Sequence, residues 1–254
     1  MNSAYKLPDH YRLALFGDID STNSEALRRA HRCEPGGVWI VAERQLQGRG
    51  RSGRMWQSEK GNFYGSLLLQ LDITSDALQQ LPLAIGVAAY DAISAVAQLP
   101  ENSALHLKWP NDILLERAKL GGILIESMKP AGATTTYVAI GIGLNLAHHP
   151  DDATRAATNL NTHNYAVTPS AMLQALAHAI DLRLGVWDLG RGNESIRQAW
   201  LQRAIGIGDE VSVKLSTEVC HGIFEGIDDQ GALRLRQKDG TKRRITFGDV
   251  MLHA

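Results

Sequence analysis

The sequence has few cysteines and no long apolar run, and each shortage narrows the class of protein. Two cysteines, Cys33 and Cys220, stand far apart in 254 residues. One possible bridge in a chain of this size does not indicate a disulfide scaffold, so we expect both thiols to be reduced. No stretch approaches the ~20 apolar residues that cross a bilayer, and the amino terminus has no apolar signal region. The sequence therefore predicts a soluble, cytoplasmic protein.

Net charge is also nearly absent. The chain has 26 basic and 27 acidic side chains, a formal net charge of −1. This balance argues against nucleic acid or an anionic membrane as a partner recognised by bulk charge, so recognition of an anion has to be local. With 44% apolar residues, the chain is long enough for one large domain and a small appendage.

Residues 45–56 are a candidate for local recognition of an anion, because arginines and glycines are interleaved there. Glycine lets backbone N–H groups approach a ligand, and the planar guanidinium suits phosphate or carboxylate. We interpret the stretch as a loop that closes over an anionic ligand. The alternative is a solvated basic loop that binds nothing.

Gly48, Gly50 and Gly53 in this loop have the spacing of a dinucleotide fingerprint, G-x-G-x-x-G. That motif requires a strand that ends at the first glycine and a helix that begins at the last. The apolar run 38–42 ends well before Gly48, and no helical period follows Gly53. The context therefore argues against a Rossmann site, and the absence of G-x-x-x-x-G-K-[ST] argues against a Walker loop.

Hydrophobic periodicity predicts an α+β protein, a mixed sheet flanked by helices. A helix is expected to begin near Thr22, where Thr22 and Glu25 have capping-box spacing. Another is expected over 83–98, after Pro82 in its first turn. A third should begin at Thr168-Pro169 and run to residue 187, and a shorter one should be capped by Asn193. Strands are expected at 13–16, 38–42, 63–69, 105–109, 113–115, 119–126 and 137–146.

The composition changes near residue 205. Short alternating strands then follow, separated by turns at 228–231 and 238–240. This pattern predicts a small all-β module, interpreted as a barrel related to SH3 domains. The expected domains are residues 1–205 and 206–254.

Three further stretches combine charge, amide or glycine with strand ends. They are 108–112, 119–126 and 141–145. Each stretch alone is weak evidence for a binding site, because a lysine at a strand end is more often solvated and Asn111-Asp112 is typical of a turn. Together with Ser21-Thr22-Asn23 and the arginine loop, they resemble the signatures of the biotin-protein ligase family, in that family's order. The resemblance covers nearly the whole chain.

The resemblance implies an enzyme that joins biotin to ATP, giving biotinyl-5′-AMP and pyrophosphate, and then transfers biotin to a lysine of a biotin carboxyl carrier protein. The residues that it implies for catalysis are Arg51, Lys119, Lys108 and Asp112. Those that it implies for biotin are Ser21, Thr22, Asn23, Gln45, Arg49, Gly50, Arg51 and Lys119. Those that it implies for ATP are Arg51, Arg54, Trp56, Lys108, Asn111 and Asn145. Mg²⁺ is implied with the phosphates, and no protein metal site is expected.

Ser52 departs from the family pattern, which often has a second arginine there, so the resemblance does not imply a phosphate contact from this position. For Trp56, ordinary packing is the alternative to covering adenine. Two other functions stay open: a lipoate ligase with the same chemistry, and a biotin-sensing DNA-binding regulator. The near-zero net charge and the early Ser-Thr-Asn signature argue against the regulator. No DNA or membrane partner is expected, and the expected oligomeric state is a monomer or a homodimer.

Overall fold

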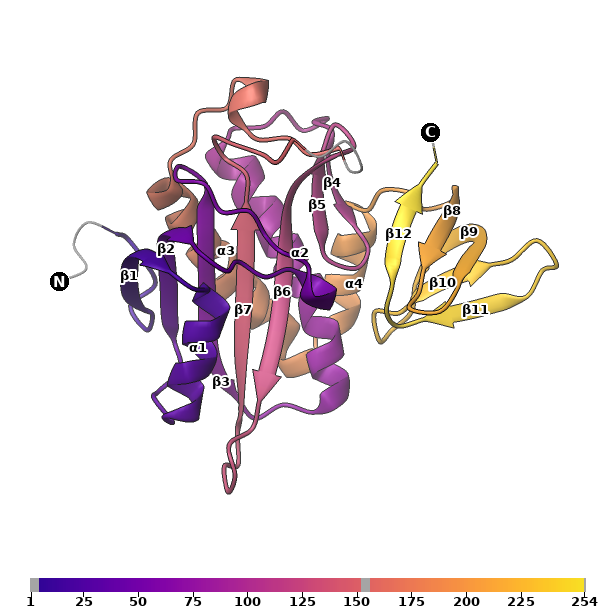
Figure 1. Cartoon of the computed structure of the whole chain (residues 1–254). Helices are drawn as coiled ribbons and strands as arrows, with labels where there is room; N and C mark the ends of the chain where they lie inside the picture. The colour runs from indigo at the N-terminus through magenta and orange to yellow at the C-terminus, as the bar shows by residue number, and fades with distance from the viewer. Residues whose placement is uncertain (1–4, 152–155, 254) are drawn as a thin grey trace.

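A seven-stranded mixed sheet forms the centre of the larger part of the molecule (Figure 1). The computed structural model describes residues 5–151 and 156–253. The strand order is β1-β2-β3-β7-β6-β5-β4, in which β1 and β2 are parallel and the other neighbours antiparallel. The strands are β1 (Arg12–Ile19), β2 (Val38–Gln45), β3 (Phe63–Leu71), β4 (Leu105–Lys108), β5 (Asp112–Leu115), β6 (Ala118–Met128) and β7 (Thr136–Leu144).

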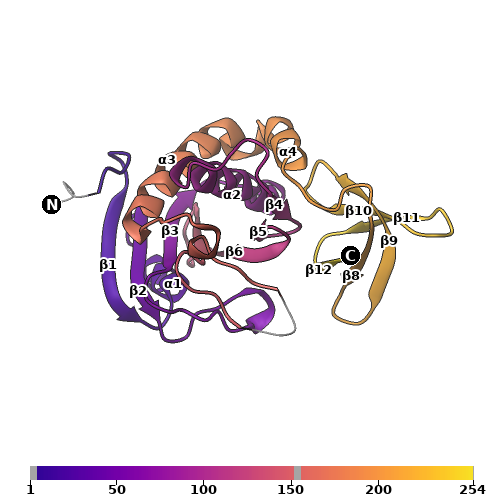
Figure 2. The same ribbon diagram turned by 90° about the horizontal axis from the view of Figure 1, so that it is seen from above.

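Helices cover both faces of this sheet (Figure 2). They are α1 (Thr22–His31), α2 (Ser75–Val96), α3 (Pro169–Trp187) and α4 (Asn193–Leu201). On β3, Leu68 packs in the cluster that contains Ala26 and Ala30 of α1, whereas Leu67 and Leu69 face the larger core that contains α2 and α3. Alternate residues of one apolar strand therefore enter two different cores, which explains why the run 63–69 is apolar nearly throughout.

The predicted helices exist, and α1 begins at Thr22 as expected, but the predicted caps of α1 and α4 and the predicted start of α2 were wrong. Ser21, not Thr22, caps α1, because its side chain accepts from the Ser24 backbone N–H. α2 begins at Ser75 under a Thr74 cap, so Pro82 lies inside the helix instead of in its first turn. α4 has Gly192 as its cap, and the Asn193 amide donates to the Asp229 carbonyl instead. At α1 and α4 the cap lies one residue before the predicted one, because the Thr22 hydroxyl donates to Gln45 and the Asn193 amide donates to Asp229.

The described residues contain no helix that is both long and apolar enough to cross a membrane. The described residues of the segment 148–165 contain one short 3₁₀ turn (Asn161–His163) and an isolated parallel bridge from Ala157 to Lys119. Three-residue 3₁₀ turns also occur at Arg51–Gly53 and Asp188–Gly190.

Strands β8 to β12 form the C-terminal domain, an antiparallel sheet in the order β11-β10-β9-β8-β12. They are β8 (Glu210–Lys214), β9 (Val219–Ile227), β10 (Leu233–Arg236), β11 (Lys242–Ile245) and β12 (Asp249–Leu252). The sequence did not reveal β12, which has only four residues. No ladder joins β11 to β12 in the described part of the chain, so the sheet is open.

This domain lies beside α4 and the β4–β5 edge of the large sheet (Figure 1). The Trp109 indole N–H donates to the Gly231 carbonyl at 3.0 Å, and Arg197 of α4 donates to the Ile227 carbonyl at 3.3 Å. The turn after β9 thus anchors the domain, and this placement brings β12 close to the loop that follows β2.

Candidate functional site

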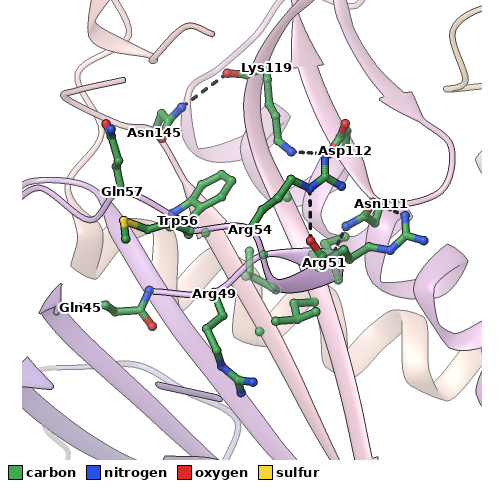
Figure 3. Close-up of a pocket in the computed structure, with 18 of the residues that line it drawn as sticks. Gln45, Arg49, Arg51, Arg54, Trp56, Gln57, Asn111, Asp112, Lys119 and Asn145 are labelled. Atoms are coloured by element: carbon green, nitrogen blue, oxygen red, sulfur yellow. Dashed lines mark hydrogen bonds and ion pairs between the residues drawn. The ribbon is translucent and has the colours of Figure 1, made fainter. Parts of the chain in front are cut away.

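A cleft of about 690 Å³ opens over the large sheet, between the loop after β2, the amino terminus of α1 and strands β6 and β7. It gathers every residue that the sequence singled out for the site except Lys108. Those that line it are Ser21, Thr22, Asn23, Gln45, Arg49, Gly50, Arg51, Arg54, Trp56, Asn111, Asp112, Lys119 and Asn145 (Figure 3). Lys108 lies directly behind this wall, because its ammonium is 2.9 Å from a carboxylate oxygen of Asp112.

One end of the cleft is a buried network of neutral groups. Thr22 and Asn23, in the first turn of α1, are only 4% and 3% exposed. The Gln45 amide oxygen accepts from both the backbone N–H and the hydroxyl of Thr22, at 2.9 and 3.1 Å. The buried hydroxyl of Ser66 lies 2.7 Å from the Thr22 hydroxyl and 2.6 Å from the Asn23 amide oxygen. We call this set Thr22, Asn23, Gln45 and Ser66 the neutral half of the site.

Gly141 on β7 gives the neutral half its depth. A Cβ atom at this position would stand 2.4 Å from the Asn23 amide oxygen, so any larger residue would expel that side chain. Gly141 thus allows the Asn23 side chain to approach β7 closely.

The loop after β2 is a compact hairpin-like turn. The backbone N–H of Gly50 donates to the Arg54 carbonyl at 2.8 Å, and that of Trp56 donates to the Gly48 carbonyl at 2.9 Å. Ser52 has a φ of 56° and is exposed at the tip, outside the cleft lining. Strand β2 ends at Gln45 and no α-helix follows Gly53, which confirms that the dinucleotide motif lacks its required context.

The other end of the cleft is charged. Asp112, at the start of β5, accepts from the ammonium groups of both Lys119 and Lys108. Burial alone would raise the pKa of Asp112, but the two lysines outweigh it and lower this pKa to about 2. At neutral pH the cluster is therefore one carboxylate between two cations. We call Arg51, Arg54, Lys108, Asp112 and Lys119 the charged half.

The two arginines of the charged half are held by the C-terminal domain. Arg54 pairs with Asp249 at 2.9 Å, and Arg51 donates to the Gly248 carbonyl at 3.3 Å and to the Asn111 amide oxygen at 3.2 Å. Lys108 donates to the Val250 carbonyl at 3.2 Å. Burial lowers the pKa of Arg51, and the nearby charges of Asp249 and Asp112 oppose that shift. Three consecutive residues around the start of β12 thus contact three cations of the site.

Trp56 lies flat against the floor of the cleft between the two halves (Figure 3). A Cβ on Gly143 would be 2.7 Å from its indole ring, so this glycine makes room for the ring. The Lys119 ammonium is 5.5 Å from the ring centroid, within range of a cation–π contact. Asn145 is buried, and its amide donates to the Thr158 carbonyl at 3.1 Å and the Lys119 carbonyl at 3.4 Å. Asn145 therefore holds the backbone at Lys119.

No group of three or more His, Cys, Asp or Glu side chains suited to a metal occurs within residues 5–151 and 156–253. Three residues that organise the site escaped the sequence analysis: Ser66, Glu126 and Asp249. Ser66 is a polar residue inside an apolar strand, a signal that could have been noticed. The other two are ordinary surface-type acids, whose partners become apparent only in the fold.

In comparisons with known proteins, family models match both the large domain and the C-terminal domain. The model described as "Biotin/lipoate A/B protein ligase family" matches residues 16–145, and "Biotin protein ligase C terminal domain" matches residues 206–252. The chain is 40% identical to a biotin–[acetyl-CoA-carboxylase] ligase of Paracoccus denitrificans, over 87% of this chain and 92% of that protein. It is 32% identical to a bifunctional ligase/repressor of Bacillus spizizenii, over 92% of this chain and 72% of that protein.

A solved structure supports the same relationship. The biotin protein ligase from Aquifex aeolicus in complex with biotin and ATP aligns with a TM-score of 0.80 and 26% identity. The alignment covers 95% of this chain and 98% of that chain. The similarity therefore extends through the large sheet and the C-terminal domain.

Proposed function

This chain belongs to the Biotin/lipoate A/B protein ligase family, and from that premise we propose that it is an ATP-dependent biotin-protein ligase. It activates biotin as biotinyl-5′-AMP and transfers biotin to a lysine of a biotin carboxyl carrier protein. The observation that carries the proposal is the cleft itself, which joins a buried neutral half to a charged half within about 690 Å³. Biotin combines a neutral ring system with a carboxylate, and these two halves match its two ends.

In the proposed first step, a carboxylate oxygen of biotin attacks the α-phosphorus of ATP and the bond to the β-phosphate breaks. Two anions meet, so preorganised cations are the main requirement. Lys119 and Arg51 are assigned to the carboxylate and α-phosphate, with Arg54 and Lys108 toward the rest of the nucleotide. Thr22, Asn23 and Gln45, with Ser21, are assigned to the biotin ring, and the backbone at Arg49 and Gly50 to its edge.

For the nucleotide base we assign Trp56, whose ring lies on the cleft floor, with Asn111 and Asn145 fixing the surrounding backbone. Mg²⁺ would accompany the phosphates, held mainly by their oxygens and by water, and would neutralise charge on the leaving pyrophosphate. Asp112 is not assigned to the metal, because both of its oxygens already accept from lysines.

In the proposed second step, the acceptor amine attacks the carbonyl carbon of the mixed anhydride, AMP leaves, and the nitrogen loses a proton. An unperturbed lysine has a pKa of ~10.4, so only a small fraction is neutral near pH 7. Asp112, with a pKa of about 2, is a weak base. We therefore assign it to orienting the lysines and the incoming amine. Unchanged transfer from preformed adenylate in Asp112→Asn would remove even that role.

The direct test is mass spectrometry of a carrier domain incubated with this protein, biotin and Mg-ATP. A single biotinyl adduct on lysine is the expected result, and its absence at saturating substrates would overturn the proposal. ATP–pyrophosphate exchange should require biotin. Dependence on lipoate instead would identify a lipoate ligase, the alternative within the same family.

A biotin-sensing regulator is the alternative from another class, since one relative is named a bifunctional ligase/repressor. A gel shift with biotin-operator DNA distinguishes it, and no shift is expected. We also propose a division into residues 1–205 and 206–254, which is supported by the start of the second family match at residue 206. The proposed setting is the cytoplasm.

A further inference from the structure

Glu126, near the end of β6, is an acidic residue beside the neutral half that none of the proposed steps uses. One of its carboxylate oxygens, Oε2, accepts two hydrogen bonds at once. The donors are the Asn23 amide at 2.8 Å and the Arg49 guanidinium, also at 2.8 Å. One atom thus connects the first turn of α1 with the loop after β2, two segments far apart in the sequence.

The bond to Asn23 fixes which way that amide faces. Its nitrogen donates to Glu126 and to the Leu124 carbonyl at 3.2 Å, and its oxygen lies 2.6 Å from the Ser66 hydroxyl. An amide flip would place the oxygen against the Glu126 carboxylate, which is electrostatically unfavourable. Glu126 therefore orients a side chain of the neutral half.

The bond to Arg49 fixes the position of the loop. Figure 3 shows the Arg49 side chain pointing away from Lys119 and Asp112, so this guanidinium does not join the charged half. Arg49 also forms an isolated antiparallel bridge with Met55, across the base of the hairpin-like turn. A tether at Arg49 consequently holds the whole segment 49–55, including Arg51 and Arg54, over the cleft.

We propose that Glu126 is a positioning residue that couples closure of the arginine loop to the orientation of Asn23. The loop keeps its closed position through the Arg49 ion pair, and the same oxygen keeps the neutral half aligned. Its effect on biotin and the adenylate rests on the proposed function, whereas the tether between loop and strand does not.

Two variants separate the two bonds. Glu126→Gln keeps an oxygen that accepts from Asn23 but removes the charge that pairs with Arg49, whereas Glu126→Ala removes both. Glu225→Gln is the matched control, because Glu225 is also a strand carboxylate with two partners, here Arg236 and Lys242, and pairs with neither Asn23 nor the arginine loop. Arg49→Met alone and combined with Glu126→Gln completes a double-mutant cycle.

The first measurement is the rate of tryptic cleavage after Arg51 and Arg54 in the ligand-free protein, followed by mass spectrometry. Cleavage of a locally opening segment follows the population of its open form. Arg49 and Glu126 are 41% and 26% exposed, so their pair is of moderate strength. We expect Glu126→Gln and Arg49→Met each to speed cleavage about two- to five-fold, and the double variant to add nothing beyond either one.

The second measurement uses the enzyme reaction. Glu126→Gln should raise the dissociation rate of biotinyl-5′-AMP by the same factor of about two to five. Glu126→Ala should in addition raise the KM for biotin with little change in kcat, and Gln should restore that KM. Cleavage rates like those of Glu225→Gln, or additive effects in the cycle, would overturn the tether. If the wild-type protein forms no adenylate, the proposed function fails, and the cleavage assay still decides on the tether.

Discussion

The neutral and charged halves of the cleft differ in how their polar groups are satisfied. In the neutral half, Thr22, Asn23, Gln45 and Ser66 bond to one another and to the backbone of the large domain. In the charged half, the cations are held by Asp112 and Asp249 and by two carbonyls of the C-terminal domain. One half is complete within one domain, and the other is assembled from two.

This difference indicates which half a ligand has to rearrange. A neutral ring can enter a network whose donors and acceptors are already oriented, so little reorganisation is required. A phosphate has to replace protein oxygens that neutralise the arginines and lysines, and its binding is therefore an exchange of anions. The charged half should be the more sensitive to substitution, because lost cations are not replaced by any neighbour.

The largest effect is expected when Lys119, the central cation of the charged half, is removed. Lys119→Ala should reduce biotin-dependent ATP–pyrophosphate exchange about 100-fold, the usual scale for losing one preorganised charge-stabilising donor. Lys60→Ala is the control, since Lys60 is an exposed lysine paired with Glu43, and it should change the rate little. Wild-type exchange in Lys119→Ala would show that Lys119 is a surface charge only.

The next test separates the halves by ligand. Arg51→Ala should raise the dissociation rate of biotinyl-5′-AMP about 30-fold and weaken the Kd for biotin much less, because the adenylate offers Arg51 a phosphate that biotin lacks. Stopped-flow release of adenylate and calorimetry of biotin measure the two quantities. Arg44→Ala, which breaks an exposed pair with Asp18, is the control. Equal losses for both ligands would contradict the division.

Acid should remove the stability that Asp112 contributes through the charged half. The pKa of Asp112 is lowered from 3.8 to about 2, so its carboxylate stabilises the fold above about pH 4, and this contribution is lost as the pH falls from about 4 to 2. The shift corresponds to about 2 kcal/mol of unfolding free energy. Urea unfolding between pH 2 and 6 should show this dependence in the wild type and a flatter one in Asp112→Asn. Parallel curves would mean that the two lysines do not stabilise the carboxylate.

The smallest effect belongs to the neutral half. Ser66→Ala removes one hydroxyl from a network that is otherwise intact, at a cost of about 1 kcal/mol. The Kd for biotin should rise about five-fold, and the KM for ATP should stay constant. Ser127→Ala, on the exposed side of β6, is the control. A change in the KM for ATP would show that the halves are coupled through β3.

Much of the fold was predictable because its signals are local. Alternation identified most strands, and Thr168-Pro169 identified the start of α3. Helix starts depend on which of several polar residues finds a backbone partner, so the cap of α1 was placed at Thr22 instead of Ser21, and Thr74 was missed as the cap of α2. Strand β12 was missed because its consecutive apolar residues 250–252 show no alternation, and only pairing with β8 defines it.

The site was predictable where residue types are unusual for their position, as with arginines among glycines or lysines at strand ends. It was not predictable where ordinary residues acquire partners through the fold. Glu126 meets Arg49 across 77 positions, and Arg54 meets Asp249 across 195. No local sequence pattern indicates pairs so far apart in the chain. The Arg54–Asp249 pair forms only because β12 packs against the loop after β2.

The contacts at Gly248 and Val250 have a consequence for mutagenesis. Both are made by backbone carbonyls, so a side-chain scan of β12 would leave the acceptors for Arg51 and Lys108 in place. Gly248 is the exception. Its φ is 144°, and a Cβ there would stand 3.0 Å from Leu215 and Val213 side-chain atoms and 3.1 Å from the Lys214 carbonyl. A methyl group added at Gly248 would therefore displace the backbone at this position. The Gly248 carbonyl, which accepts from Arg51 and which no substitution can remove, would move with it.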